Sequence, residues 1–202
     1  MKVLITGTPG VGKTTVCRIA AQRLGVRCVE AAAVLAGKPF TSWDPYSLTY
    51  DIIDVDAARR ELSRELASDH ILDTHVLDLV GDVDRVFVLR KRPDVLLRDL
   101  SGRDWPLHKI LDNVWAELLD YIYVEAKDRW GRVHQIDVTD RSSLETADAV
   151  VDCLKGGVCI DERVDWLSYS LESGFLERLE SICGISRCPV GPRRRQPEES
   201  AE

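Results

Sequence analysis

The segment that most constrains this chain is Gly7–Thr14, which reads GTPGVGKT and fits the pattern G-x-x-x-x-G-K-[ST]. It follows Lys2–Thr6, a short apolar run of strand length, and precedes helically spaced apolar residues at Val16, Ile19, Ala20 and Leu24. Glycines let backbone N–H groups converge on phosphate oxygens, and the helix that begins there adds the positive end of its dipole. A glycine-rich turn without a nucleotide is the simpler alternative. The flanking strand and helix favour a loop that binds a nucleoside triphosphate.

Three side chains have the chemistry that a triphosphate and its metal ion need. Lys13 is expected to reach the β- and γ-phosphates, and the Thr14 hydroxyl is placed for Mg²⁺. Downstream, Ile71-Leu72-Asp73 ends an apolar run with a carboxylate, the placement of a second acid that binds Mg²⁺ through water. A strand-end aspartate can also cap the next turn, but beside a phosphate loop the metal role is favoured.

Two further residues are candidates for the reaction itself. His75 follows in Asp73-Thr74-His75, where an imidazole could position an attacking water or a phosphoryl group, since an unperturbed pKa near ~6.5 permits either protonation state near neutrality. Arg103 lies in the break Ser101–Pro106 between two predicted helices. A guanidinium in such a mobile setting can close over the triphosphate and neutralise transition-state charge. The alternative is an ordinary surface arginine.

Beyond that break, three polar residues share one face of the next predicted helix. Lys109, Asn113 and Glu117 follow one another at intervals of four residues. This face either turns toward the nucleotide or is a solvated polar surface.

Length and charge limit the class of protein. A chain of 202 residues suits one α/β domain, or one domain with an appendage. Its formal net charge of −7 argues against a general nucleic-acid surface, so any contact with RNA should be local or come through a partner. No apolar run approaches the ~20 residues that span a bilayer, and Met1 leads directly into the first predicted strand. We expect a protein of the cytoplasm, or of the nucleus in a eukaryote.

Six cysteines bear on redox state and metal binding. Cys17 and Cys28 fall in the first predicted helix and the second predicted strand, where buried free thiols are the usual state. The remaining four, at 153, 159, 183 and 188, are separated by five and four residues in place of the two typical of zinc sites. We expect thiols in a reducing compartment and no structural metal.

Apolar runs alternate with helical patterns along most of the chain. The predicted strands are Lys2–Thr6, Val26–Val29, His70–Asp73, Arg85–Arg90 and Val133–Ile136. Strands that alternate with helices indicate a parallel sheet with helices on both faces. We expect this domain to occupy residues 1–157, with a long insertion at 30–69 whose second half is helical, and with one helix from about Leu107 to Trp130.

The chain changes character after Lys155-Gly156-Gly157, which ends a predicted helix. Residues 161–181 have the spacing of one amphipathic helix whose apolar face holds Val164, Leu167, Leu171, Phe175, Leu176 and Leu179. This face either packs on the domain or binds a partner, and packing is favoured because an exposed apolar stripe is costly. We expect a helical extension at 158–190 and a disordered tail at 191–202, whose three arginines either contact RNA or are solvated.

Four segments together resemble a known family. They are GTPGVGKTT at Gly7–Thr15, ILDTH at Ile71–His75, VFVLR at Val86–Arg90 and RDWPLHKILDNVWAE at Arg103–Glu117, followed by Glu125-Ala126. This combination is similar to the adenylate kinase isoenzyme 6, or CINAP-type, family of archaea and eukaryotes. The loop motif is shared with many kinases, whereas Asp-x-His and the K-[IL]-x-x-N-x-x-x-E helix are more specific. The similarity covers about Met1 to Leu154.

The resemblance implies a P-loop fold like that of nucleoside monophosphate kinases, with the monophosphate bound by 30–69 and a short lid at 101–108. It implies transfer of a phosphoryl group from Mg-ATP to AMP, hydrolysis of ATP, and a role in small ribosomal subunit maturation with a ribosomal protein as partner and an indirect association with pre-ribosomal RNA. By position, Asp73 would hold the Mg²⁺ water shell, His75 would serve hydrolysis, and Arg103 would be the lid contact. The phosphates would be held by Gly10, Val11, Gly12, Lys13, Thr14 and Thr15.

Two other functions stay open on the sequence alone. One is a nucleotide-dependent assembly factor that hydrolyses ATP slowly as a switch, which His75 and the C-terminal helix favour. The other is a kinase of a different nucleoside monophosphate or small metabolite, because the acceptor pocket is not recognisable. The long insertion favours a kinase over a plain GTPase, and the guanine-selective N-K-x-D motif is absent from the sequence.

Overall fold

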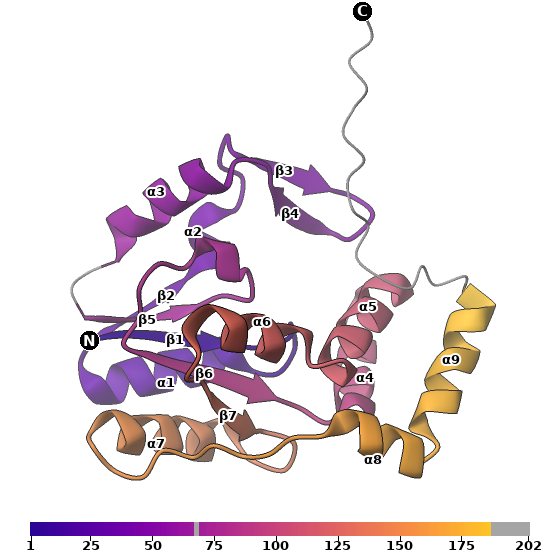
Figure 1. Cartoon of the computed structure of the whole chain (residues 1–202). Coiled ribbons are helices and arrows are strands. Elements are labelled where there is room, and N and C mark those ends of the chain that lie inside the picture. Colours follow the sequence, from indigo (N-terminus) through magenta and orange to yellow (C-terminus); the bar gives the residue numbers. More distant parts are fainter. Residues whose placement is uncertain (67–68, 187–202) are drawn as a thin grey trace, which may run out of the picture.

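The computed structural model of this chain describes residues 1–66 and 69–186. Its central sheet has five strands in the order β2-β5-β1-β6-β7. Their bounds are Lys2–Thr6 for β1, Arg27–Glu30 for β2, His70–Asp73 for β5, Arg85–Arg90 for β6 and His134–Asp137 for β7. Every pairing is parallel, so all five carboxyl ends meet at one edge of the sheet (Figure 1). The predicted strands are confirmed to within one residue.

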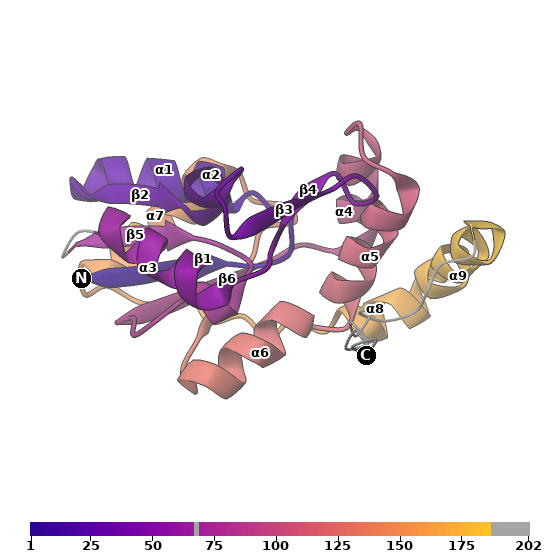
Figure 2. The same cartoon turned by 90° about the horizontal axis from the view of Figure 1, so that it is seen from above.

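Helices cover both faces of the sheet, as Figure 2 shows. Alternate residues of β1 divide between two apolar clusters: Val3 and Ile5 lie with residues of α1 (Lys13–Leu24) and α7 (Ser143–Leu154). Leu4 lies in the other cluster, with residues of α3 (Val55–Glu65) and α6 (Tyr121–Trp130). This two-sided burial follows from the period of two along a strand, and it confirms the predicted α/β class.

The long insertion after β2 contains a hairpin that the sequence did not predict. After the short helix α2 (Ala31–Leu35), strands β3 (Thr41–Asp44) and β4 (Thr49–Ile52) pair antiparallel, with Trp43 opposite Tyr50. The Asp44 carboxylate accepts hydrogen bonds from the backbone N–H groups of the turn that follows it, at Tyr46 and Ser47. The helix predicted for the second half of the insertion is present as α3.

The helix predicted from Leu107 to Trp130 is wrong, because the chain breaks between α5 (Leu107–Leu118) and α6. Asp120 stands at the break with a φ of 58°, in the left-handed region that interrupts a helix. Its carboxylate accepts a hydrogen bond from the guanidinium of Arg90, at the end of β6. The break between α5 and α6 thus coincides with a hydrogen bond to β6, which is distant in the sequence. The remaining helices of this part are the 3₁₀ turn η1 (Leu77–Leu79) and α4 (Pro93–Ser101).

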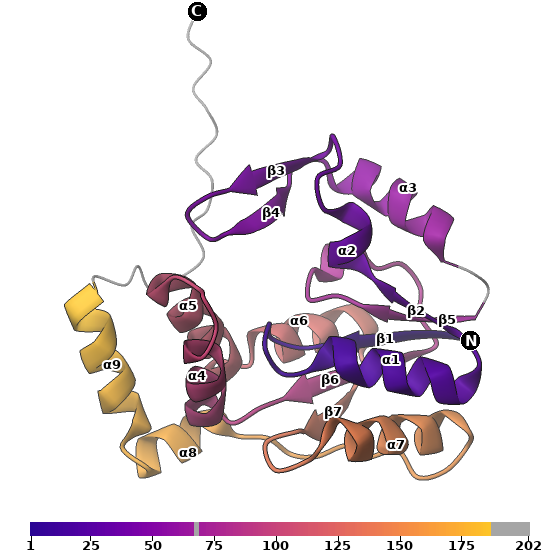
Figure 3. The same cartoon turned by 180° about the vertical axis from the view of Figure 1, so that it is seen from behind.

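The single C-terminal helix expected over 161–181 is also wrong. The structure has α8 (Trp166–Glu172) and α9 (Phe175–Ser186), separated at Gly174, whose φ is 66°. Because the helix axis changes direction there, one apolar face does not run through both pieces (Figure 3). Phe175 and Leu179 are buried in the core cluster, whereas Leu167 and Leu171 are 45% and 53% exposed. The tail expected at 191–202, with Arg193-Arg194-Arg195, lies outside the described residues, as does Cys188.

Four cysteines form two disulfides, so the expectation of free thiols is wrong for them. Cys17–Cys28 joins α1 to β2, and Cys153–Cys159 joins the end of α7 to the segment that follows it. The Cα atoms are 5.7 and 4.4 Å apart, within the range that a disulfide spans. The fold creates this proximity, and the spacing along the sequence does not reveal it. Over the described part of the chain, no helix combines the length and apolar character required to cross a bilayer.

Candidate nucleotide-binding site

The glycine-rich loop joins the carboxyl end of β1 to the start of α1. Gly7 and Gly10 have φ angles of 137° and 105°, which L side chains rarely adopt. A Cβ atom on Gly10 would lie 2.6 Å from the side chain of Leu100, and one on Gly7 would lie 2.4 Å from the backbone oxygen of Leu89. Both positions therefore require glycine. The loop lies at the edge of the sheet where the strands end, because it directly follows the carboxyl end of β1 (Figure 1).

Lys13 begins α1 with its side chain folded back against the loop. Its ammonium donates to the backbone oxygen of Thr8 at 3.2 Å. Burial lowers the pKa of Lys13 to about 8, the negative charges of Asp73 and Glu117 oppose this change, and the positive charge of Arg103 adds to it. The buried ammonium has lost part of its hydration. A negatively charged phosphate beside it would replace the stabilisation that water gives an exposed lysine. Of the other loop residues, Val11 is buried and Thr15 is exposed, with Gly10 and Gly12 between these extremes.

Thr14 and Asp73 meet beside the loop. Because β5 is parallel to β1 and adjacent to it, Asp73 is level with Ile5 and lies at the same edge as the loop. The Thr14 hydroxyl donates to the Asp73 carboxylate at 2.5 Å. Burial raises the pKa of Asp73, while the charge of Lys13 and the Thr14 hydrogen bond act in the opposite direction. A hydroxyl and a carboxylate oxygen are hard donors of the kind that Mg²⁺ prefers, so this pair fits that ion.

His75 lies just past the end of β5. Loss of hydration among the surrounding elements, followed by the positive charges of Lys13 and Lys109, lowers the pKa of His75 to about 4, although the residue as a whole is exposed. At neutral pH the imidazole is therefore uncharged and has one nitrogen able to accept a proton or a hydrogen bond.

Arg103 is exposed in the segment between α4 and α5. Its guanidinium carbon lies 5.0 Å from the centre of the Trp105 ring, and the Lys109 ammonium lies 4.0 Å from the same ring. The structure therefore brings together Lys13, Thr14 and Asp73, while Arg103 affects Lys13 through its charge and is stacked on Trp105.

The hairpin of the insertion reaches this segment (Figure 3). The Tyr46 ring stacks on His108 with centroids 3.7 Å apart, and Lys109 donates to the backbone oxygen of Leu48 at 3.4 Å. The tip of the hairpin thus contacts the start of α5, close to Arg103. The sequence predicts the insertion but does not predict this contact.

Glu117 lies at the centre of a hydrogen-bond network beside the loop. Its carboxylate is buried and accepts from Thr8 Oγ1, Arg90 Nε, Lys91 N and Trp166 Nε1. Of the helix face predicted at Lys109, Asn113 and Glu117, only Glu117 turns into the protein, and Asn113 instead donates to the backbone oxygen of Lys109. Thr8, Arg90 and Trp166 were not identified from the sequence, although an arginine ending the buried run Val86–Arg90 was a signal that could have been used.

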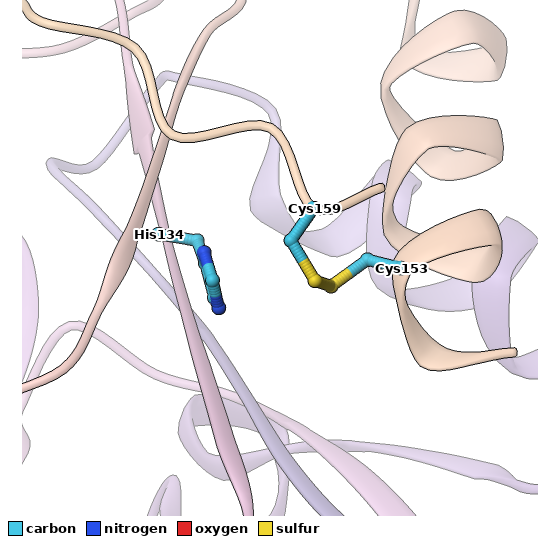
Figure 4. Close-up of side chains that lie close together, drawn as sticks. All are labelled: His134, Cys153 and Cys159. Carbon is cyan, nitrogen blue, oxygen red and sulfur yellow. A yellow bond between two sulfur atoms is a disulfide. The ribbon is translucent and has the colours of Figure 1, made fainter. Parts of the chain in front are cut away.

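A second cluster lies at the start of β7, at the opposite edge of the sheet from the phosphate loop. There His134 lies beside the Cys153–Cys159 disulfide (Figure 4). The ring nitrogen and the two sulfur atoms lie within 4.8 Å of one another. Cysteine binds metals as the thiolate, and both sulfurs are joined to each other here. In this oxidised state the cluster offers a metal ion only His134.

This chain is similar in sequence and in fold to several known proteins. A family model described as "AAA domain" matches residues 3–120. The "Putative adenylate kinase" of Pyrobaculum aerophilum is 51% identical over 181 residues, covering 90% of this chain and 93% of the relative. The protein of the same name from Methanothermobacter thermautotrophicus is 37% identical over 171 residues, covering 84% and 99%. The crystal structure of a sugar kinase from Janibacter sp. HTCC2649 covers 76% of this chain and 94% of its own, with a TM-score of 0.52 and 19% identity, and shows a shared fold.

Proposed function

Because this chain belongs to the family of P-loop nucleotide kinases that includes the two archaeal relatives, we propose that it transfers the γ-phosphoryl group of Mg-ATP to AMP. The observation that carries the proposal is the grouping of the glycine-rich loop, Lys13 and the Thr14–Asp73 pair at one edge of the sheet. Phosphoryl transfer depends mainly on positioning the substrates and neutralising charge, and these are the groups that such a reaction needs.

Each group has a part in the proposed reaction. The loop N–H groups and Lys13 hold the phosphates of ATP, and the Thr14 hydroxyl and Asp73 carboxylate hold Mg²⁺ directly or through water. When bound, the metal ion neutralises charge that develops on the β- and γ-phosphates. Arg103 leaves the Trp105 ring to contact the triphosphate, and the insertion at 30–69 receives the monophosphate.

Product analysis tests this proposal directly. The full chain is incubated with Mg-ATP and each of AMP, CMP, GMP and UMP in turn, with Mg-ATP alone as the reference. We expect ADP to form from both nucleotides with AMP, faster than ADP forms from ATP alone. Formation of ADP at the same rate with and without every monophosphate would contradict the kinase assignment.

Hydrolysis of ATP is a second activity, and the position of His75 favours it. The imidazole lies two residues beyond Asp73, is uncharged at neutral pH, and is open to water. It therefore orients the attacking water when no acceptor occupies the second site. Such hydrolysis would serve the role in small ribosomal subunit maturation, with a ribosomal protein as partner, that the family resemblance implies.

A histidine substitution separates the two activities. His75→Ala should reduce hydrolysis more than transfer, because in transfer the acceptor phosphate replaces the water that His75 orients. The two rates are measured on the same preparation of the variant and compared with those of wild type. Equal losses in both reactions would mean that His75 supports only the metal site.

A further inference from the structure

The segment after residue 157 contacts the nucleotide site through the indole of Trp166. Trp166, at the start of α8, donates from Nε1 to Oε1 of Glu117 at 3.1 Å. Both side chains are buried, at 8% and 2% exposure. This hydrogen bond joins residues 49 positions apart in the sequence, one from the C-terminal segment and one from the last turn of α5.

The other oxygen of the same carboxylate holds the phosphate loop. Glu117 Oε2 accepts from the Thr8 hydroxyl at 2.5 Å, and the backbone oxygen of Thr8 accepts from the Lys13 ammonium at 3.2 Å. A continuous path of three hydrogen bonds therefore runs from Trp166 through Glu117 and Thr8 to Lys13. Each of these four side chains is buried.

The orientation of Glu117 depends on how its donors are divided between the two oxygens. Oε1 receives Arg90 Nε at 2.8 Å, Lys91 N at 3.1 Å and the Trp166 indole, whereas Oε2 receives Thr8. A buried carboxylate is stable only when both of its oxygens have partners. Without the indole donor, Arg90 and Lys91 would be the remaining partners of Oε1, and we expect the carboxylate to shift toward them and away from Thr8.

Trp166 is held independently of the loop. Ahead of it, the backbone N–H of Glu162 donates to the oxygen of Gln135 in β7 at 3.0 Å. Behind it, Phe175 and Leu179 of α9 are buried in the core cluster. The chain is therefore anchored to the domain before and after Trp166, and neither anchor involves the phosphate loop.

We propose that Trp166 is a positioning residue for nucleotide binding: through Glu117 it fixes Thr8 and hence the phosphate loop and Lys13. The C-terminal segment then acts on the nucleotide site indirectly, through Glu117. This inference rests on the proposed function in one respect, that the loop binds a nucleotide.

The test uses the full chain and the affinity for Mg-ADP, measured by isothermal titration calorimetry. Trp166→Phe keeps an aromatic ring and removes the donor. The matched control is Trp115→Phe, which removes another indole donor between α5 and the C-terminal segment, the one that contacts Cys183 Sγ at 3.2 Å. We expect Trp166→Phe to raise the dissociation constant about tenfold, because a phosphate loop that is less firmly positioned has to be ordered when the nucleotide binds, and we expect Trp115→Phe to leave it unchanged.

A double-mutant cycle tests the path. Thr8→Val breaks it at the loop end, and the combination with Trp166→Phe should bind Mg-ADP no more weakly than Thr8→Val alone, because both changes remove the same coupling. Additive losses would overturn the proposal, as would wild-type affinity in Trp166→Phe. If Trp166→Phe does not fold, wild-type affinity in Thr8→Val overturns it. A wild-type chain that binds Mg-ADP but transfers no phosphoryl group would contradict the proposed function and leave this inference standing.

Discussion

Lys13 carries its charge where water reaches it poorly. Burial lowers its pKa to about 8, and the carboxylates of Asp73 and Glu117 work against that change. A bound triphosphate adds negative charge next to the ammonium and offsets the effect of burial. The lysine therefore gains more from binding a phosphate than an exposed lysine would, because the phosphate replaces missing solvation.

Substituting this lysine should abolish both proposed reactions. For Lys13→Ala we expect transfer and hydrolysis to fall by at least about 100-fold, the usual loss when one group that stabilises transition-state charge is removed. Far-ultraviolet circular dichroism should stay as in wild type, since the ammonium makes one hydrogen bond, to the loop itself. The control is Lys155→Ala, an exposed lysine after α7. Turnover by Lys13→Ala close to that of wild type would contradict the assignment.

Single residues also show how far the site was predictable. The contacts among Lys13, Thr14 and Asp73 follow from a local motif and from the rule that parallel strands end at one edge of a sheet. The partners of Glu117 do not, because Thr8 and Trp166 lie 109 and 49 positions away from it. No periodicity in a single sequence encodes such pairs, so the sequence alone left the role of Glu117 undecided.

At the scale of elements, strands were predicted better than helix ends. The runs Arg85–Arg90 and His70–Asp73 have bounds that match the structure because in each an apolar stretch stands between two polar residues. The two long helices were predicted as continuous because 3.6-residue spacing continues across their breaks. At Gly174 the glycine was a visible signal for a break. At Asp120 it was not, since a left-handed aspartate is uncommon and this one is paired with Arg90.

Two glycines of the C-terminal segment should respond oppositely to alanine. Gly174, with a φ of 66°, separates α8 from α9, so Gly174→Ala should lower the free energy of unfolding by about 1 kcal/mol. Gly184 lies within α9, and a Cβ atom added there would meet no heavy atom within 4 Å, so Gly184→Ala should raise it by about 0.5–1 kcal/mol. Urea unfolding of the two variants and wild type measures both changes. If both variants changed the free energy of unfolding by the same amount in the same direction, the helix break at Gly174 would be contradicted.

At the scale of the whole molecule, the two disulfides fix separate parts of the same face of the sheet. Cys17–Cys28 ties α1 to an edge strand, and Cys153–Cys159 ties α7 to the segment that leads to Trp166. The sequence separations are 11 and 6 residues, so each loop is short and each disulfide removes a modest amount of chain entropy from the unfolded state.

Reduction should therefore lower stability measurably. Each disulfide is worth about 2–3 kcal/mol, so a thiol reductant should lower the melting temperature by roughly 8–24 °C for a chain of this size. Calorimetry with and without reductant measures the shift. A Cys17→Ser, Cys153→Ser double variant should melt at the same temperature in both conditions. A wild-type chain that is insensitive to reductant, after its thiols have been counted, would contradict this prediction.

The position of β1 in the sheet has a consequence for synthesis of the protein. This strand comes first among the described elements, yet it lies in the middle of the sheet between β5 and β6. The neighbouring strands β5 and β6 end at Asp73 and Arg90. Neither edge of β1 can therefore pair until the ribosome has synthesised those residues. At the usual rate of translation this delay lasts roughly 4–17 s. During that time a nascent chain on the ribosome exposes an apolar strand with two open edges, which makes it a substrate for chaperones that bind extended segments.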